Sequence, residues 1–178
     1  MGSRVRLFAC ALLATMSLAL MGCGSSFHTN PNSNQWAWVS GANTVNQSGT
    51  YGTQGTPANS NVPGARAGAV TWTDRAGNFW LFGGNGYDSA GTQGQLNDLW
   101  VFTLNNQWVW VSGANTVNQS GTYGTQGTAA NSNVPGARSS AVTWTDRAGN
   151  FWLFGGTGYD PAGTQGQLND LWVFTLNN

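Results

Sequence analysis

The sequence predicts an all-β protein built from two four-stranded antiparallel repeat units. Residues 34–105 align with residues 106–177 without a gap, and only six positions differ, so 72 − 6 = 66 of the 72 are identical. Within each unit, short apolar runs are separated by clusters of Gly, Asn, Ser and Thr, as is typical of strands joined by turns. No part of the repeat has apolar residues at helical spacing between capping residues.

The first residues are typical of an export signal. Arg4 and Arg6 precede an uncharged run at 7–21, which is short for a membrane span of about 20 residues. The run ends in Leu-Met-Gly-Cys, which resembles the bacterial lipobox, where the signal is cut before a Cys that then receives lipid. We therefore expect residues 1–22 to be a lipoprotein signal peptide and Cys23 to be lipidated. Without that acylation we expect a secreted protein.

The polar stretch that follows predicts a flexible tether at 23–34. Gly24 stands where such lipoproteins carry the Asp that marks retention at the inner membrane. We therefore expect a place in the cell envelope, on the outer membrane or facing the periplasm. Removal of the signal takes away two of six Arg, leaving four Arg against six Asp. The resulting negative charge disfavours nucleic acid as a partner.

Each unit is expected to hold four short strands and two long loops. The first strand alternates Trp with smaller residues, as a half-exposed strand does, and the third has consecutive apolar residues, which indicates burial on both faces. We expect a Gly-Gly pair to end that third segment. The expected strands of the first unit are 35–40, 67–73, 79–82 and 99–104, with loops at 41–64 and 85–96.

These residues resemble the kelch repeat. The kelch pattern has an Arg at the first strand, a Gly-Gly pair after the second, Asn-Asp and an aromatic residue in the third, and a Trp opening the fourth. The matching residues are Arg66, Gly83, Gly84, Asn97, Asp98, Trp100 and Trp108, and the second unit repeats them from Arg138 to Trp172. The period of 72 exceeds the family's roughly 50, mostly through loop 41–64. The resemblance implies that each unit is one four-stranded blade of an incomplete β-propeller.

The two units divide the chain at residue 106. Residues 35–106 form the first, which opens with a fourth strand that has no unit of its own. Residues 107–178 form the second, which lacks its own final strand. We expect these ends to pair head to tail, with residues 35–40 of one chain completing the second unit of the next. Three or four chains would supply six or eight blades, within the range of about four to eight that closed rings use.

Few residues could support catalysis. The one His, His28, lies in the tether, and Cys23 would be the only Cys after signal removal. Asp74, Asp88 and Asp98 all recur 72 residues later, whereas a catalytic site is normally built once. Kelch propellers include copper oxidases, but their Tyr, His and Cys ligand set is missing here, so we expect no enzyme, no metal and no cofactor. A propeller-type enzyme or enzyme subunit, and a truncated gene product without independent activity, remain the alternatives.

Binding is the expected activity. The two long loops of an antiparallel blade emerge at the same end, where aromatic, amide and hydroxyl groups suit a sugar or a polar peptide. The alternative is that these loops are solvated and pack only on themselves. We expect a lipid-anchored, non-catalytic recognition module that binds a carbohydrate or a protein. The candidate ligand-binding residues are Tyr51, Arg66, Tyr87 and Asp88, with their copies Tyr123, Arg138, Tyr159 and Asp160.

Overall fold

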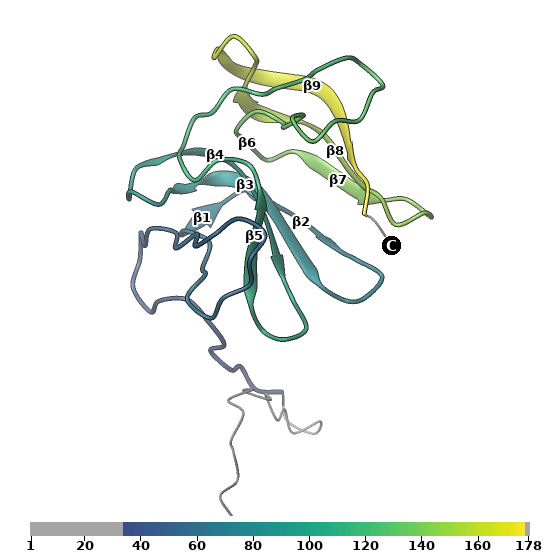
Figure 1. Ribbon diagram of the computed structural model, residues 1–178. Helices are drawn as coiled ribbons and strands as arrows, with labels where there is room; N and C mark the ends of the chain where they lie inside the picture. The colour runs from purple at the N-terminus through teal and green to yellow at the C-terminus, as the bar shows by residue number, and fades with distance from the viewer. Residues whose placement is uncertain (1–33, 177–178) are drawn as a thin grey trace, which may run out of the picture.

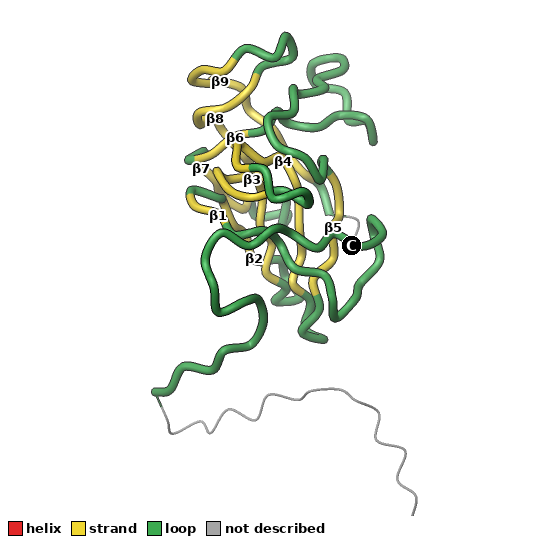
Figure 2. Tube along the Cα trace, turned by 90° about the vertical axis from the view of Figure 1, so that its left-hand side faces the viewer, coloured by secondary structure: helices red, strands yellow, loops and turns green. Residues whose placement is uncertain are grey.

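The protein is all-β over the residues that the computed structural model describes, 34–176 (Figure 1). No helix occurs in this range, so none is present there that could cross a membrane (Figure 2). The nine strands of this range pair antiparallel in one five-stranded and one four-stranded sheet, which confirms that the fold is all-β. The expected signal peptide, Cys23 and all but the last residue of the tether lie outside the described residues.

The first sheet holds five strands. β1 and β2 pair with the same edge of β3, as two parts of one strand interrupted at Gly68 and Ala69, and β4 and β5 follow on the other side. Tight turns after β2 and β4 lie at one end of the sheet, closed by Gly77 N to Asp74 O and by Asn106 N to Thr103 O. The strands are β1 (Arg66–Ala67), β2 (Val70–Thr73), β3 (Phe79–Tyr87), β4 (Gln93–Phe102) and β5 (Trp108–Ser112).

The second sheet repeats the first four strands of this arrangement and has no counterpart of β5 among the described residues. Its register copies the first, so that Trp152 lies opposite Val173 as Trp80 lies opposite Val101. Within the part of the chain that the structure describes, no strand pairs with the outer edge of β9, which lies at the top of Figure 1. The strands are β6 (Arg138–Ser139), β7 (Val142–Thr145), β8 (Phe151–Tyr159) and β9 (Gln165–Phe174).

The Gly-Gly pair bends a strand and does not end it, so the expected end of the strand at residue 82 and the expected loop at 85–96 are both wrong. β3 continues to Tyr87 through a bulge, with the register shifting between Phe82 and Gly84. Gly83 and Gly84 have φ of +64° and +101°, which glycine adopts at little cost and which a bulge requires. Only residues 88–92 remain as a loop between β3 and β4.

The strand expected at 35–40 does not form, which is a second correction. These residues pair with no strand, whereas their copy in the second repeat forms β5 against β4. The two segments differ only at Ala37 and Val109. A strand requires partners for its backbone N–H and C=O groups. Residues 108–112 find them on the edge of β4, whereas residues 35–40 have no strand edge beside them.

The core lies between the two sheets and belongs to both. Its rings interlock across the units: Trp72 stacks on Phe151 with ring centroids 5.3 Å apart, and Trp72 Nε1 donates to Trp152 O at 3.2 Å. Each unit therefore buries one face only by covering the other unit. The buried core residues are Trp72, Trp80, Phe82, Leu99, Val101 and Val109 from the first sheet, with Phe151 and Leu153 from the second.

Candidate functional site

The long loop and the β3–β4 hairpin loop lie at the same end of the sheet. Gly49 N donates to Asp88 O at 3.1 Å, which joins loop 41–64 to the hairpin of its own unit. Ser89 N donates to Asn115 O at 3.1 Å, which joins the same hairpin to the long loop of the second unit. The antiparallel strand order thus gathers the loops of both repeats into one loop end.

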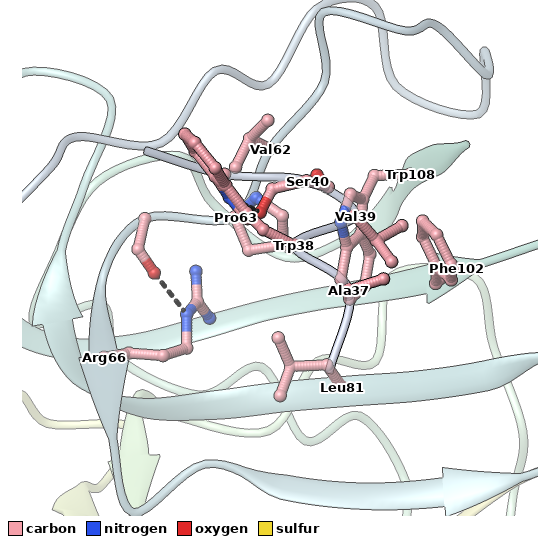
Figure 3. A pocket seen from close by; sticks show the side chains of 12 residues that line it. Ala37, Trp38, Val39, Ser40, Val62, Pro63, Arg66, Leu81, Phe102 and Trp108 are labelled. Carbon is pink, nitrogen blue, oxygen red and sulfur yellow. Dashed lines mark hydrogen bonds between the residues drawn. The ribbon is translucent and has the colours of Figure 1, made fainter. Parts of the chain in front are cut away.

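A buried ion pair lies beneath the loop end of the first unit. Asp98 is completely buried and accepts hydrogen bonds from Arg66 Nη1 and Nη2 at 2.6 and 2.7 Å. Tyr51 Oη and Trp100 Nε1 donate to the same carboxylate at 2.6 and 2.7 Å. Burial, together with the Asp98 charge, raises the pKa of Tyr51 far above its ordinary value and keeps this donor protonated. The arginine also donates to Gly83 O and, as the dashed line in Figure 3 marks, to Gly64 O.

The second unit repeats this ion pair in a more open setting. Arg138 donates to both oxygens of Asp170 at 2.7 Å, and Tyr123 and Trp172 donate to Asp170 as well. The Asp170 side chain is 15% exposed, whereas that of Asp98 is completely buried. Burial opposes ionisation of Asp170, but the hydrogen bonds from Arg138, Tyr123 and Trp172 outweigh it and lower its pKa to about 2.

Four of the predicted ligand-binding residues therefore point inward. Tyr51 and Arg66, like their copies Tyr123 and Arg138, have their polar groups held by an aspartate of their own unit. Their shared partner is not evident from the sequence, because 32 and 47 residues separate Arg66 and Tyr51 from Asp98. In this arrangement the four residues help to hold the loops in position.

Asp88 and Asp160 close the hairpin loops. Asp88 Oδ1 accepts from Ala90 N and Thr92 N at 2.9 and 2.8 Å, and its Oδ2 accepts from Val117 N at 3.3 Å. The corresponding bonds of Asp160 come from the backbone N–H groups two and four residues further on, at 2.9 and 2.8 Å. Both carboxylates satisfy backbone donors of the turn, as Asp commonly does.

The remaining predicted residues, Tyr87 and Tyr159, are half-buried at the loop end. Asn85 lies two residues before Tyr87 on β3, and Gln93 lies opposite Tyr87 on β4, so the three side chains share one face. Tyr87 Oη and Gln93 Oε1 are 3.5 Å apart, as are Gln93 Nε2 and Asn85 Oδ1. We name this group the amide–tyrosine cluster; its copy in the second unit consists of Thr157, Tyr159 and Gln165.

Sequence reasoning missed Asn85 and Gln93 because the Gly-Gly pair was expected to end the strand. The signal was present in the alternation of Asn85, Gly86 and Tyr87, which continues the strand pattern past the bulge.

Two hollows flank the segment 37–41 on the outer side of the first unit. The larger, of about 540 Å³, lies between this segment and the sheet face that carries Leu81 and Phe102 (Figure 3). The smaller, of about 420 Å³, is lined by Ala42, Pro63 and polar residues of loop 41–64. In the described range no group of three or more His, Cys, Asp or Glu side chains could hold a metal ion.

No protein-family model matches the chain, and no curated protein matches it.

The buried ion pair predicts a large difference between two Asp-to-Ala changes. Asp98→Ala leaves Arg66 charged and buried without its partner, so we expect a loss of about 3–5 kcal/mol in the free energy of unfolding. Asp160→Ala removes only two exposed turn bonds and should cost about 1 kcal/mol. Urea unfolding of both variants measures this, and equal losses would contradict the structural role of the ion pair.

The lowered carboxylate pKa values predict acid sensitivity. Asp170 and Asp146 both have a pKa of about 2 against an ordinary 3.8; hydrogen bonds from Trp152 and Asn150 lower that of Asp146. A carboxylate with a lowered folded-state pKa stabilises the fold above its unfolded pKa and loses that effect as pH falls through the folded pKa. Urea midpoints should therefore fall between about pH 4 and pH 2, and less steeply in Asp146→Asn. A midpoint that stays constant over this window would refute the assignment.

Proposed function

We propose that the protein is an exported, lipid-anchored recognition module of the kelch type, non-catalytic, which binds a carbohydrate at its loop end. The observation that carries the proposal is the amide–tyrosine cluster of Asn85, Tyr87 and Gln93. The proposed location is the cell envelope, on the outer membrane or facing the periplasm.

The chemistry of the cluster suits a neutral sugar. A tyrosine ring offers an apolar face for the C–H groups of a pyranose and a hydroxyl at its edge, and two amides offer both donors and acceptors for sugar hydroxyls. Their mutual contacts of 3.5 Å are at the limit of a hydrogen bond, so a ligand hydroxyl can replace them at little cost. Antiparallel pairing of β3 with β4 holds Tyr87 and Gln93 in place beforehand.

Repetition strengthens the proposal. The second unit carries Tyr159 and Gln165 in the same register, with Thr157 in place of Asn85. Two weak sites on one chain raise the avidity for a ligand that repeats its own units, such as a polysaccharide.

The interactions of the aspartates support a non-catalytic role. In the first unit Asp74 accepts from Asn78 and Trp80, Asp88 from the hairpin backbone, and Asp98 from Arg66. A general acid or base has to exchange a proton with a substrate, whereas these carboxylates are occupied by groups of the fold.

Contacts among the motif residues support the kelch assignment. Arg66 joins the bulge carbonyl of Gly83 to Asp98, so that three separate parts of the sequence motif meet at one point. Trp108 opens β5, the fourth position of the sheet, as the pattern requires.

The double variant Tyr87→Ala with Tyr159→Ala tests the sugar site. Loss of stacking should weaken binding by roughly 1–3 kcal/mol, as for other aromatic stacking platforms, while the urea midpoint stays near that of the wild type. Binding is measured on a glycan array, with Gln54→Ala in the exposed part of loop 41–64 as the control. An array signal that survives in the double variant would refute the site, and binding of a protein with no glycan signal would refute the ligand class.

Cys23→Ser tests the anchor. If Cys23 carries the lipid, the variant should move from the membrane fraction to the soluble fraction of the envelope. Fractionation followed by immunoblotting measures this, and membrane partitioning equal to that of the wild type would contradict the lipid anchor.

A further inference from the structure

Corresponding residues of the two units differ sharply in exposure. Leu99 is 5% exposed and its copy Leu171 is 54% exposed; Phe82 is 5% exposed and its copy Phe154 is 43%. The reverse holds on the opposite face, where Phe151 is 1% exposed and its copy Phe79 is 39%. The interface between the units therefore has two different sides, and each side occurs a second time with no second sheet packed against it in the described chain.

These two outer faces are copies of surfaces that already fit each other. The outer face of the second unit copies the face that the first unit packs against Phe151 and Leu153. The outer face of the first unit, with Phe79 and Leu81, copies the face that carries Phe151 and Leu153. Since 66 of 72 positions are identical, a second copy of the chain presents a complementary surface to each of them.

Residues 36–46, which we name the N-terminal strap, share two positive φ values and one local hydrogen bond with their copy at 108–118. Gly41 and Gly113 have φ of +83° and +80°, and Asn46 and Asn118 have φ of +60° and +61°. Trp38 Nε1 donates to Ser40 O at 2.9 Å, as the copy of this pair does in β5. The strap therefore has the shape of a segment that covers a sheet edge, although it pairs with no strand.

The copy of the strap, which includes β5, shows which surfaces a strap of this sequence binds. β5 pairs with β4 on one side, with Val109 opposite Val101 and Trp108 opposite Phe102. On its other side loop 41–64 holds it, because Gly55 N donates to Trp110 O at 2.8 Å and Asn61 Nδ2 donates to Trp108 O at 3.1 Å. A covering strand is thus held from both sides.

The second unit has the copies of this strand edge and of this loop, but among the described residues no strand lies between them. β9 supplies the edge that β4 supplies in the first unit, and Gly127 and Asn133 stand at the positions of Gly55 and Asn61. Asn133 Nδ2 keeps the local bond to Thr128 O that its copy makes to Thr56 O. In the first unit the second acceptor of this amide is Trp108 O of the covering strand, and no strand of the described chain takes that place beside β9.

We propose that the N-terminal strap of one copy of this chain fills the slot between β9 and loop 113–136 of another copy. Ala37 then lies opposite Val173 of the second copy, and Trp36 lies opposite its Phe174. The two exposed faces pack on each other as the two units do within one chain. Because the two contacting surfaces differ, the contact is heterologous and repeats from chain to chain until a ring closes.

The two hollows beside the strap agree with this occupant. Within the chain, Asn97 Nδ2 donates to Pro135 O at 3.3 Å and Asn97 Oδ1 accepts from Ala114 N at 3.0 Å. Pro63 and Ala42, the copies of Pro135 and Ala114, line the smaller hollow. Asn169 of the second copy, which corresponds to Asn97, would enter that hollow. This inference does not depend on what the loop end binds.

Gly166→Val tests the contact without disturbing the single chain. A Cβ at Gly166 meets no atom within 4 Å, whereas at its copy Gly94 it would lie 2.8 Å from Val117 and 2.6 Å from Asn118, in the copy of the strap. The variant should therefore keep the urea midpoint of an isolated chain and lose assembly. Gln165→Val is the matched control, because its copy Gln93 stays exposed beside the covering segment.

Mass by light scattering on the Cys23→Ser chain, as recovered from the cells that express it, gives the result. We expect the parent to form a discrete oligomer, Gln165→Val to keep it, and Gly166→Val and Trp38→Ala to fall to single chains. A parent that is a folded single chain at micromolar concentration overturns the proposal. So does an oligomer that persists in Gly166→Val.

A mixing experiment shows that the contact joins separate chains. In the Cys23→Ser background one preparation carries Ala37→Cys and another carries Val173→Cys. Mixed and oxidised, they should form a disulfide-linked pair in high yield, because the two positions are directly opposite in the proposed pairing. Absence of the linked pair in a mixture that still contains oligomers would overturn the proposed register.

Discussion

The fold depends on the ion pair between Arg66 and Asp98, because its hydrogen bonds join β1, β3, β4 and the long loop of the first unit. Arg66 comes from β1, Asp98 from β4, and the Gly83 carbonyl from the bulge in β3, while Tyr51 brings in the long loop. Two opposite charges away from water are expensive unless their remaining hydrogen-bonding groups are filled. Here the carboxylate accepts four bonds from three side chains, so removal of one member leaves several buried groups without partners.

This ion pair also limits what the surface can do. It withdraws an arginine, a tyrosine and an aspartate of each unit from the loop end, and the hairpin turn withdraws a second aspartate. What remains exposed there is mainly neutral: amides, hydroxyls and the half-buried rings of Tyr87 and Tyr159. Neutral groups of this kind discriminate by shape and by hydrogen bonding, which is the basis of our proposal that the loop end recognises an uncharged ligand.

The sequence predicts the features that neighbouring residues determine. The identity of the repeats predicts the two units, and the clusters of Gly and Asn predict the tight turns, in one of which Asp74 accepts from the backbone N–H of Asn78. The errors occur where distant residues decide the outcome. The Gly-Gly pair permits either a strand end or a bulge, and the pairing with β4 decides for the bulge. The segment 35–40 has the pattern of a strand but no sheet edge beside it. The burial of Arg66 depends on a partner 32 residues away, which the residues around it do not reveal.

Because the repeats are nearly identical, the two outer faces of the described chain are copies of the two faces that meet in its core. A unit that buries one face only against its neighbour cannot complete its own core, so stability comes from interfaces between successive units. Duplication of such a unit copies both sides of the interface along with it, and the sequence QGQLNDLWVF is buried as β4 and open as β9. Complementary ends therefore arise from the duplication itself and need no separately evolved contact. A long apolar edge left open would be an aggregation hazard, which is why a strap of matching sequence, already in the covering conformation, is the occupant that the structure favours.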